Sequence, residues 1–147
     1  METEARIEDV VELLGLEGGK QQGYSRLWLA HQIAEGLPIT AVDRVASIVF
    51  EEQKHLFGMI VSDATMKRRR KDKKPLSPEN SERVERVARV WTVARDVFGG
   101  DDKSRRFMFK PHMLLDGKVP MEVAALNDVG ADAVESLLGR LKYGSAA

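Results

Sequence analysis

The longest regular pattern in the sequence lies in its centre, between Ser77 and the pair Gly99-Gly100. Ser77 is a good helix N-cap, and Pro78 follows at the first helical position, where its missing N–H does no harm. Two glycines end the pattern, as at a helix C-terminus. Between these signals the apolar residues recur at helical spacing over about six turns: Val84, Val87, Ala88, Trp91, Ala94, Val97 and Phe98.

The rest of the chain repeats the helical period in shorter segments, and no stretch alternates apolar and polar residues as a strand would. Thr40 and Asp43 have the spacing of a capping box, which predicts a helix start there. The other expected helices are residues 7–14 before Gly15, a helix capped by Ser25 and ended by Gly36, a short helix through "EEQKHLFGMI", a helix capped by Ser62, helices starting at Asp101 and Pro120, and a last helix capped by Asp128. We therefore predict an all-α chain of two helical units, residues 1–74 and 75–147.

A run of basic residues lies just before the predicted boundary. Seven of the eight residues from Lys67 to Lys74 are basic, although the formal net charge of the chain is +0. A short helix, a tight connection and a capped helix come in the order of a helix-turn-helix, and the basic residues would then contact DNA phosphates. The residues expected to contact DNA are Ser62, Asp63, Thr65, Met66, Lys67, Arg68, Arg69, Arg70 and Lys71.

Two observations qualify the helix-turn-helix interpretation. A charge run is also typical of a solvated linker, which is the alternative interpretation of this segment. The turn between the two helices usually holds a glycine, because its backbone needs a positive φ. Ile60 stands at that place here and Gly58 comes two positions earlier, so we expect either an irregular turn or a partly degenerate motif.

No motif in the sequence indicates catalysis, a metal or a cofactor. The chain has no cysteine, which excludes disulfides and thiolate metal sites. Its three histidines are scattered, and the segment "GLEGGKQ" lacks the spacing of a phosphate loop. Asp101-Asp102 is interpreted as a helix cap, because a calcium loop needs more oxygen ligands. The acidic first residues do not resemble a signal peptide and no apolar run has membrane-spanning length, so a cytoplasmic protein without membrane contact is expected.

The C-terminal segment "LLGRLKYGSAA" groups basic and aromatic residues beside Leu141. Tyrosine and arginine are common anchors at protein interfaces, so this tip is a candidate binding surface. A frayed C-terminus is the alternative interpretation.

Several segments resemble the Xre/MbcA/ParS family of antitoxins. "LSPENSERVERVARVWTVARDVFG", "PMEVAAL" and "ESLLGRLKYG" match, in order, the C-terminal toxin-binding domain of that family from Leu76 to Gly144. "GLPITAVDRVASIVF" and "SDATMKRRRK" resemble its Xre-like helix-turn-helix half. Val119 precedes Pro120 where the family usually has a capping threonine, so we expect a weaker helix start at that place.

The resemblance implies a type II antitoxin with no catalytic residue, metal or cofactor of its own. It would neutralise a RES-domain toxin, an enzyme that degrades NAD, by covering the active site of the toxin with the C-terminal domain and tail. It would also bind the promoter of its own operon as a homodimer. The residues assigned to toxin contact are Leu114, Leu115, Arg140, Leu141, Lys142, Tyr143, Gly144 and Ser145. The alternative is a stand-alone helix-turn-helix regulator whose C-terminal helices dimerise or bind a ligand.

Overall fold

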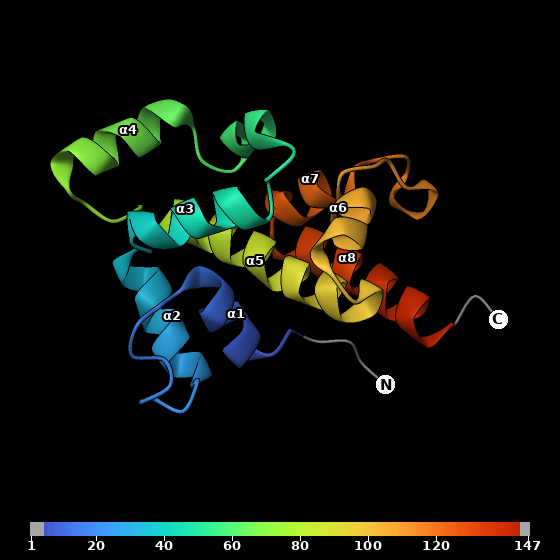
Figure 1. Ribbon diagram of the computed structural model, residues 1–147, viewed down its shortest axis with the longest axis horizontal. Coiled ribbons are helices and arrows are strands. Elements are labelled where there is room, and N and C mark those ends of the chain that lie inside the picture. The colour runs from blue at the N-terminus through green and yellow to red at the C-terminus, as the bar shows by residue number, and fades with distance from the viewer. Residues whose placement is uncertain (1–4, 145–147) are drawn as a thin grey trace.

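The computed structural model describes residues 5–144 of the chain. Within this range the protein is all-α, as predicted, and it contains no strand, only one isolated bridge between His112 and Lys118. Figure 1 shows the arrangement of its helices. They are α1 (Ile7–Leu14), α2 (Arg26–Glu35), α3 (Ile39–Ile48), the 3-10 helix η1 (Lys54–Met59), α4 (Asp63–Asp72), α5 (Pro78–Phe98), α6 (Asp101–Met108), the 3-10 helix η2 (Met113–Leu115), α7 (Pro120–Leu126) and α8 (Asp128–Tyr143).

Three of the predicted serine caps are confirmed. The hydroxyl of Ser25 accepts a hydrogen bond from the backbone N–H of Trp28, with an N···O distance of 3.2 Å. Ser62 and Ser77 cap α4 and α5 in the same way, each through the backbone N–H three residues further on. Each cap satisfies one N–H that would otherwise lack a partner at the helix start, so these three boundaries follow from local sequence.

Two other predicted N-caps are wrong. α3 begins at Ile39 with Pro38 at its N-cap and no side-chain cap, so Thr40 lies inside the first turn and forms no capping box. Pro38 has the extended conformation that leads into a helix, and this moves the start two residues upstream of the predicted box. α8 is capped by Asn127, whose side chain accepts from the N–H of Gly130 at 2.9 Å, and not by Asp128.

The starts of α6 and α7 have no side-chain cap. At α7 this confirms the expectation for Val119. At α6 the interpretation of Asp101 as a cap is wrong, because its carboxylate accepts hydrogen bonds from Arg95 at 2.6 Å and from the indole of Trp91 at 3.2 Å. The side chain of Asp101 therefore joins α6 to α5.

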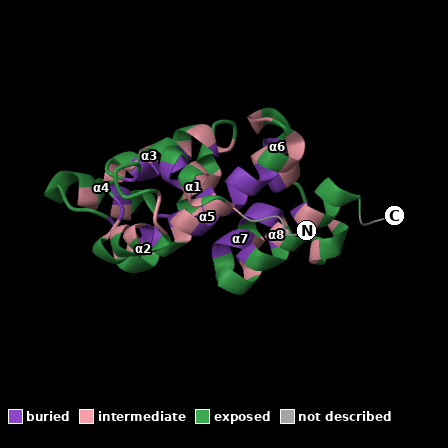
Figure 2. Cartoon of the chain, turned by 90° about the horizontal axis from the view of Figure 1, so that it is seen from below, coloured by how far each residue is buried: buried purple, intermediate pink, exposed green. Residues whose placement is uncertain are grey.

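Helix α5 is the axis of the molecule (Figure 1). It packs against α1, α2 and α3 of the first half and against α6, α7 and α8 of the second. Most of its apolar residues, including Val84, Val87 and Trp91, are fully buried in a core that draws on both halves of the chain. Figure 2 shows the buried residues on the inner sides of the helices. The division at residues 74 and 75 stays a prediction, since the core is continuous across it.

The segment between α4 and α5 is fixed to the turn between α2 and α3. The N–H of Leu76 donates to the carbonyl of Leu37 at 3.0 Å, and the N–H of Leu37 donates to the hydroxyl of buried Ser81 at 2.8 Å. Gly36 has φ +103°, and a Cβ there would lie 2.2 Å from the carbonyl oxygen of Leu76. Only glycine allows this approach, which brings the end of α4 close to the start of α3.

Candidate nucleic-acid and partner interfaces

Helix α4 lies on the surface of the molecule and packs against α3 (Figure 1). Met66 is its buried residue, with 9% of its surface exposed, and it belongs to the core. Met66 was predicted to contact DNA, but the structure buries its side chain. The residue instead anchors α4 to the core, and its charged neighbours are left to face solvent.

The turn before α4 does not need a glycine. Ile60 has φ −91° and ψ −55°, which is right-handed helical backbone open to any residue. Its side chain is fully buried, and its carbonyl accepts a hydrogen bond from Arg83 Nη1 at 3.1 Å. The helix before this turn, η1, is a 3-10 helix and not an α-helix.

The basic residues of α4 differ in their surroundings. Arg70 forms an ion pair with Asp43 of α3, and Lys67 pairs with Asp63 at 3.1 Å. Arg68 and Lys71 are exposed and form no ion pair with any residue in 5–144. These two side chains are thus the cations of α4 that are most available to an anionic partner.

Some of the residues predicted to contact DNA at the start of α4 form hydrogen bonds within the helix itself. The hydroxyl of Ser62 lies 2.8 Å from that of Thr65 and also accepts from the Thr65 N–H. Asp63 is exposed, and its carboxylate would repel phosphates unless Lys67 neutralises it. Arg69 is half-buried, and it lies beside Arg70 in a cleft against the start of α3.

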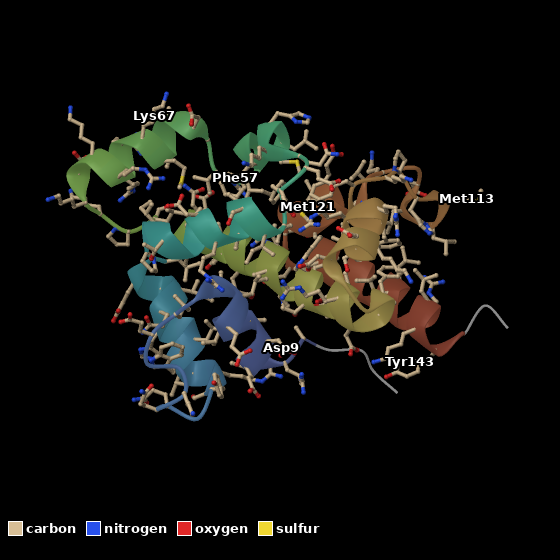
Figure 3. The ribbon with its side chains drawn as sticks, in the orientation of Figure 1. Asp9, Phe57, Lys67, Met113, Met121 and Tyr143 are labelled. Atoms are coloured by element: carbon tan, nitrogen blue, oxygen red, sulfur yellow. The ribbon has the colours of Figure 1, made fainter. Side chains whose placement is uncertain are left out.

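Two apolar side chains stand at the tip of η2. Met113 is 87% exposed and Leu114 is 57% exposed, whereas Leu115 packs partly against the core. His112 fixes the start of this turn, because its Nδ1 accepts from the N–H of Leu114 at 3.1 Å. Figure 3 shows Met113 at the outer edge of the loop. The sequence prediction omitted Met113, although it is the most exposed large apolar residue of the described chain.

The end of α8 carries a second exposed apolar pair, Leu141 and Tyr143. Between them Lys142 forms an ion pair with Asp96 of α5, and its Nζ lies 5.4 Å from the ring centre of Tyr143. Hydrogen bonding to Asp96 raises the pKa of Lys142. The last turn is thus tied to α5 and stays helical to Tyr143, after which Gly144 ends it at φ +62°. Of the other predicted contacts, Arg140 is exposed on this turn and Ser145 lies outside the described residues.

The predicted DNA-binding surface and the predicted toxin-binding surface lie at opposite ends of the molecule (Figure 1). α4 stands at one end, and the η2 loop and the C-terminal end of α8 point toward the other. Sequence reasoning missed a further exposed apolar pair, Leu126 and Val129, at the corner between α7 and α8. Within residues 5–144 no group of three potential metal ligands is found. No helix in that range is both long and apolar enough to cross a membrane.

Comparison with protein families matches the two parts of the chain to two domains. Residues 29–89 match the antitoxin Xre-like helix-turn-helix domain. Residues 93–144 match the antitoxin Xre/MbcA/ParS C-terminal toxin-binding domain. A comparison with curated proteins gave no significant match. The first matched segment contains α4 and the second contains the η2 loop and α8.

Proposed function

Because this chain belongs to the Xre/MbcA/ParS family of antitoxins, we propose that it neutralises a RES-domain toxin and represses its own operon. Membership makes it a type II antitoxin with a DNA-binding helix-turn-helix domain and a toxin-binding domain. The identity of the toxin as an NAD-degrading enzyme, and repression of the operon by a homodimer, are the parts that we propose.

The observation that supports toxin neutralisation best is the exposed apolar surface of the C-terminal half. Met113, Leu114, Leu141 and Tyr143 all belong to the segment that matches the toxin-binding domain, and all are exposed. Large apolar side chains gathered at one end of a protein mark an interaction site, because burying them against a partner removes apolar surface from water. We propose that these residues cover the entrance to the toxin active site, so that NAD cannot enter.

The proposed repression rests on α4. Its exposed cations, Arg68 and Lys71, supply phosphate contacts, which give affinity without reading the sequence. A homodimer places two such helices on the two halves of a palindromic operator and gains affinity that one small helix lacks. The η2 loop and the end of α8 lie at the other end of the molecule from α4 (Figure 1), which supports a chain that holds toxin and DNA together. We propose that the chain binds both the toxin and the operator DNA in the cytoplasm.

The experiment that tests this proposal is co-expression with the RES-domain product of the adjoining gene, followed by affinity purification through a tag on this chain. We expect a stable complex with the wild-type chain and loss of the complex when residues 140–147 are deleted. Arg68→Ala is the matched control, because it changes the opposite end and should leave the complex intact. If the wild-type chain retains no toxin, the proposal is wrong and a stand-alone regulator is the remaining function.

A further inference from the structure

We infer that the cleft between the start of α3 and the end of α4 binds a single phosphate group of the DNA backbone. This inference rests on the DNA binding proposed above, and it extends the DNA contact to residues beyond α4 and on a second helix. The two helices run in opposite directions, so that the end of α4 returns to the start of α3 (Figure 1).

The cleft has a volume of about 390 Å³ and is lined by eight residues. Four belong to the start of α3 or to the α4–α5 connection and carry no charge: Pro38, Ile39, Thr40 and Pro75. The other four are cationic: Arg69, Arg70, Lys73 and Lys74. No acidic residue lines it, so the lining attracts anions.

Little in the described chain neutralises these charges. Of the four cations, Arg70 pairs with Asp43 of α3, which does not line the cleft. Lys73 and Lys74 are exposed and form no ion pair within residues 5–144. The Nε of Arg69 is buried and finds no hydrogen-bond acceptor among those residues. A buried cationic group without an acceptor is unfavourable, and an anion in the cleft beside the Arg69 guanidinium would offset part of that cost through its charge.

The backbone at the end of α4 supports the same inference. Lys73 has φ +55°, a left-handed conformation that glycine adopts without strain and lysine does not. Two backbone hydrogen bonds close the last turn of α4: the Lys73 N–H donates to the Arg70 carbonyl at 3.3 Å, and the Lys74 N–H donates to the Arg69 carbonyl at 3.0 Å. A helix end of this kind usually carries glycine. The lysine at this position adds a cation to the cleft at the cost of backbone strain.

The start of α3 adds neutral donors to the cationic side chains. Its first turn has no side-chain cap. The Ala41 N–H already donates to the carbonyl of Pro38, so the N–H groups of Ile39 and Thr40 are the ones without a partner within the helix. The N-terminal end of α3 is also the positive end of the helix dipole, which attracts anions. Together with the four cations, these N–H groups give a phosphate donors on two sides of the cleft.

The test uses a double variant in which Lys73→Gly is combined with Lys74→Gln. Lys73→Gly removes a charge and also relieves the strained φ, so weaker DNA binding cannot be ascribed to a damaged fold. The control is Lys103→Gln with Lys110→Gln, which removes the same charge from the α6 region, in the half that matches the toxin-binding domain. Binding to a duplex from the promoter region is measured by fluorescence anisotropy at several salt concentrations.

We expect the double variant to bind at least about tenfold more weakly at low salt, and its salt dependence to fall by about one ion per phosphate lost. The control should match the wild type in both respects. If wild type binds the duplex and the double variant binds like the control, the inference is wrong and the DNA binding stands. If wild type binds no duplex, the proposed DNA binding is wrong and the inference fails with it.

Duplexes that carry one uncharged methylphosphonate at a time then show whether a single phosphate is involved. We expect one position in each half-site where neutralisation weakens binding of the wild type but not of the double variant. A double variant that responds to every position as the wild type does would overturn the inference, because its lysines would then act only through general charge.

Discussion

Asp43 of α3 and Arg70 of α4 form a bidentate ion pair, in which Arg70 Nη2 lies 3.0 Å from Asp43 Oδ1 and Nη1 lies 3.1 Å from Oδ2. This hydrogen bonding raises the pKa of Arg70. The pair ties the basic helix to α3, and it means that the cations of α4 are not equivalent. A phosphate that contacts Arg70 must compete with Asp43, whereas one that contacts Arg68 competes with no acidic residue of the described chain.

Arg68→Ala is therefore expected to weaken DNA binding more than Arg70→Ala. Each phosphate contact that is lost lowers the dependence of log K on log salt by about 0.9. We expect a change of that size for Arg68→Ala and a smaller one for Arg70→Ala, measured by anisotropy titrations on the same duplex. The opposite order would show that Asp43 does not compete for Arg70.

Leu141→Ala combined with Tyr143→Ala is expected to weaken toxin binding without unfolding the chain. Both side chains are more than a third exposed, so their removal costs the free protein little. Truncating anchor residues at an interface commonly costs about 2 kcal/mol or more of binding free energy. Calorimetric titration with purified toxin measures this loss. Leu27→Ala is the control, because Leu27 is exposed on α2 in the other half, and an equal loss there would argue against a specific surface.

Gly130→Ala is expected to destabilise the C-terminal half. A Cβ at Gly130 would lie 2.1 Å from the backbone carbonyl oxygen of Val123, so α7 and α8 would have to move apart. Overpacking of this kind costs about 1–3 kcal/mol of unfolding free energy, which chemical denaturation measures. Gly58→Ala is the control, since a Cβ there would meet nothing within 4 Å. If both variants unfold at the same denaturant concentration, the close packing of α7 on α8 is wrong.

Glu85→Gln is expected to change how stability depends on pH. Burial raises the pKa of the Glu85 carboxyl above 4.5, against the opposing effect of Arg89. The folded chain then binds this proton more tightly than the unfolded chain does. The contribution of Glu85 to stability therefore falls as pH rises from about 4.5 through the raised pKa.

Glutamine has no proton to lose, so the variant lacks this fall. We expect the unfolding free energy of Glu85→Gln, relative to wild type, to be higher at about pH 7 than at about pH 4. Denaturation at both pH values measures the difference, with Glu79→Gln, exposed on the same helix, as the control. A difference of the opposite sign would mean that Arg89 holds Glu85 ionised.

The sequence predicts this fold well where the signals are local. Ser25, Ser62 and Ser77 cap the helices they were expected to cap, because an N-cap acts through the backbone only three residues away. Local chemistry also explains the errors. Thr40 and Asp43 match a capping box, but Pro38 starts the helix earlier. Asn127 and Asp128 are both good caps, and spacing alone does not choose between them.

The candidate interfaces were harder to predict, because they depend on contacts between distant residues. Met66 was assigned to the DNA surface, although it is the largest apolar residue in a very polar helix, and that pattern favours burial. No sequence rule pairs Arg70 with Asp43, which lies 27 residues away, or Lys142 with Asp96, which lies 46 residues away. The phosphate cleft combines α3 with the end of α4, and only the packing of the two helices brings their residues together.

The most direct measurement is NAD consumption by the purified RES-domain toxin as this chain is added in increasing amounts. We expect NAD loss to stop once the chain is present in stoichiometric excess, and to continue when residues 140–147 are deleted. If a complex forms and the toxin within it consumes NAD at its full rate, the chain does not block the active site, and the proposed neutralisation is wrong.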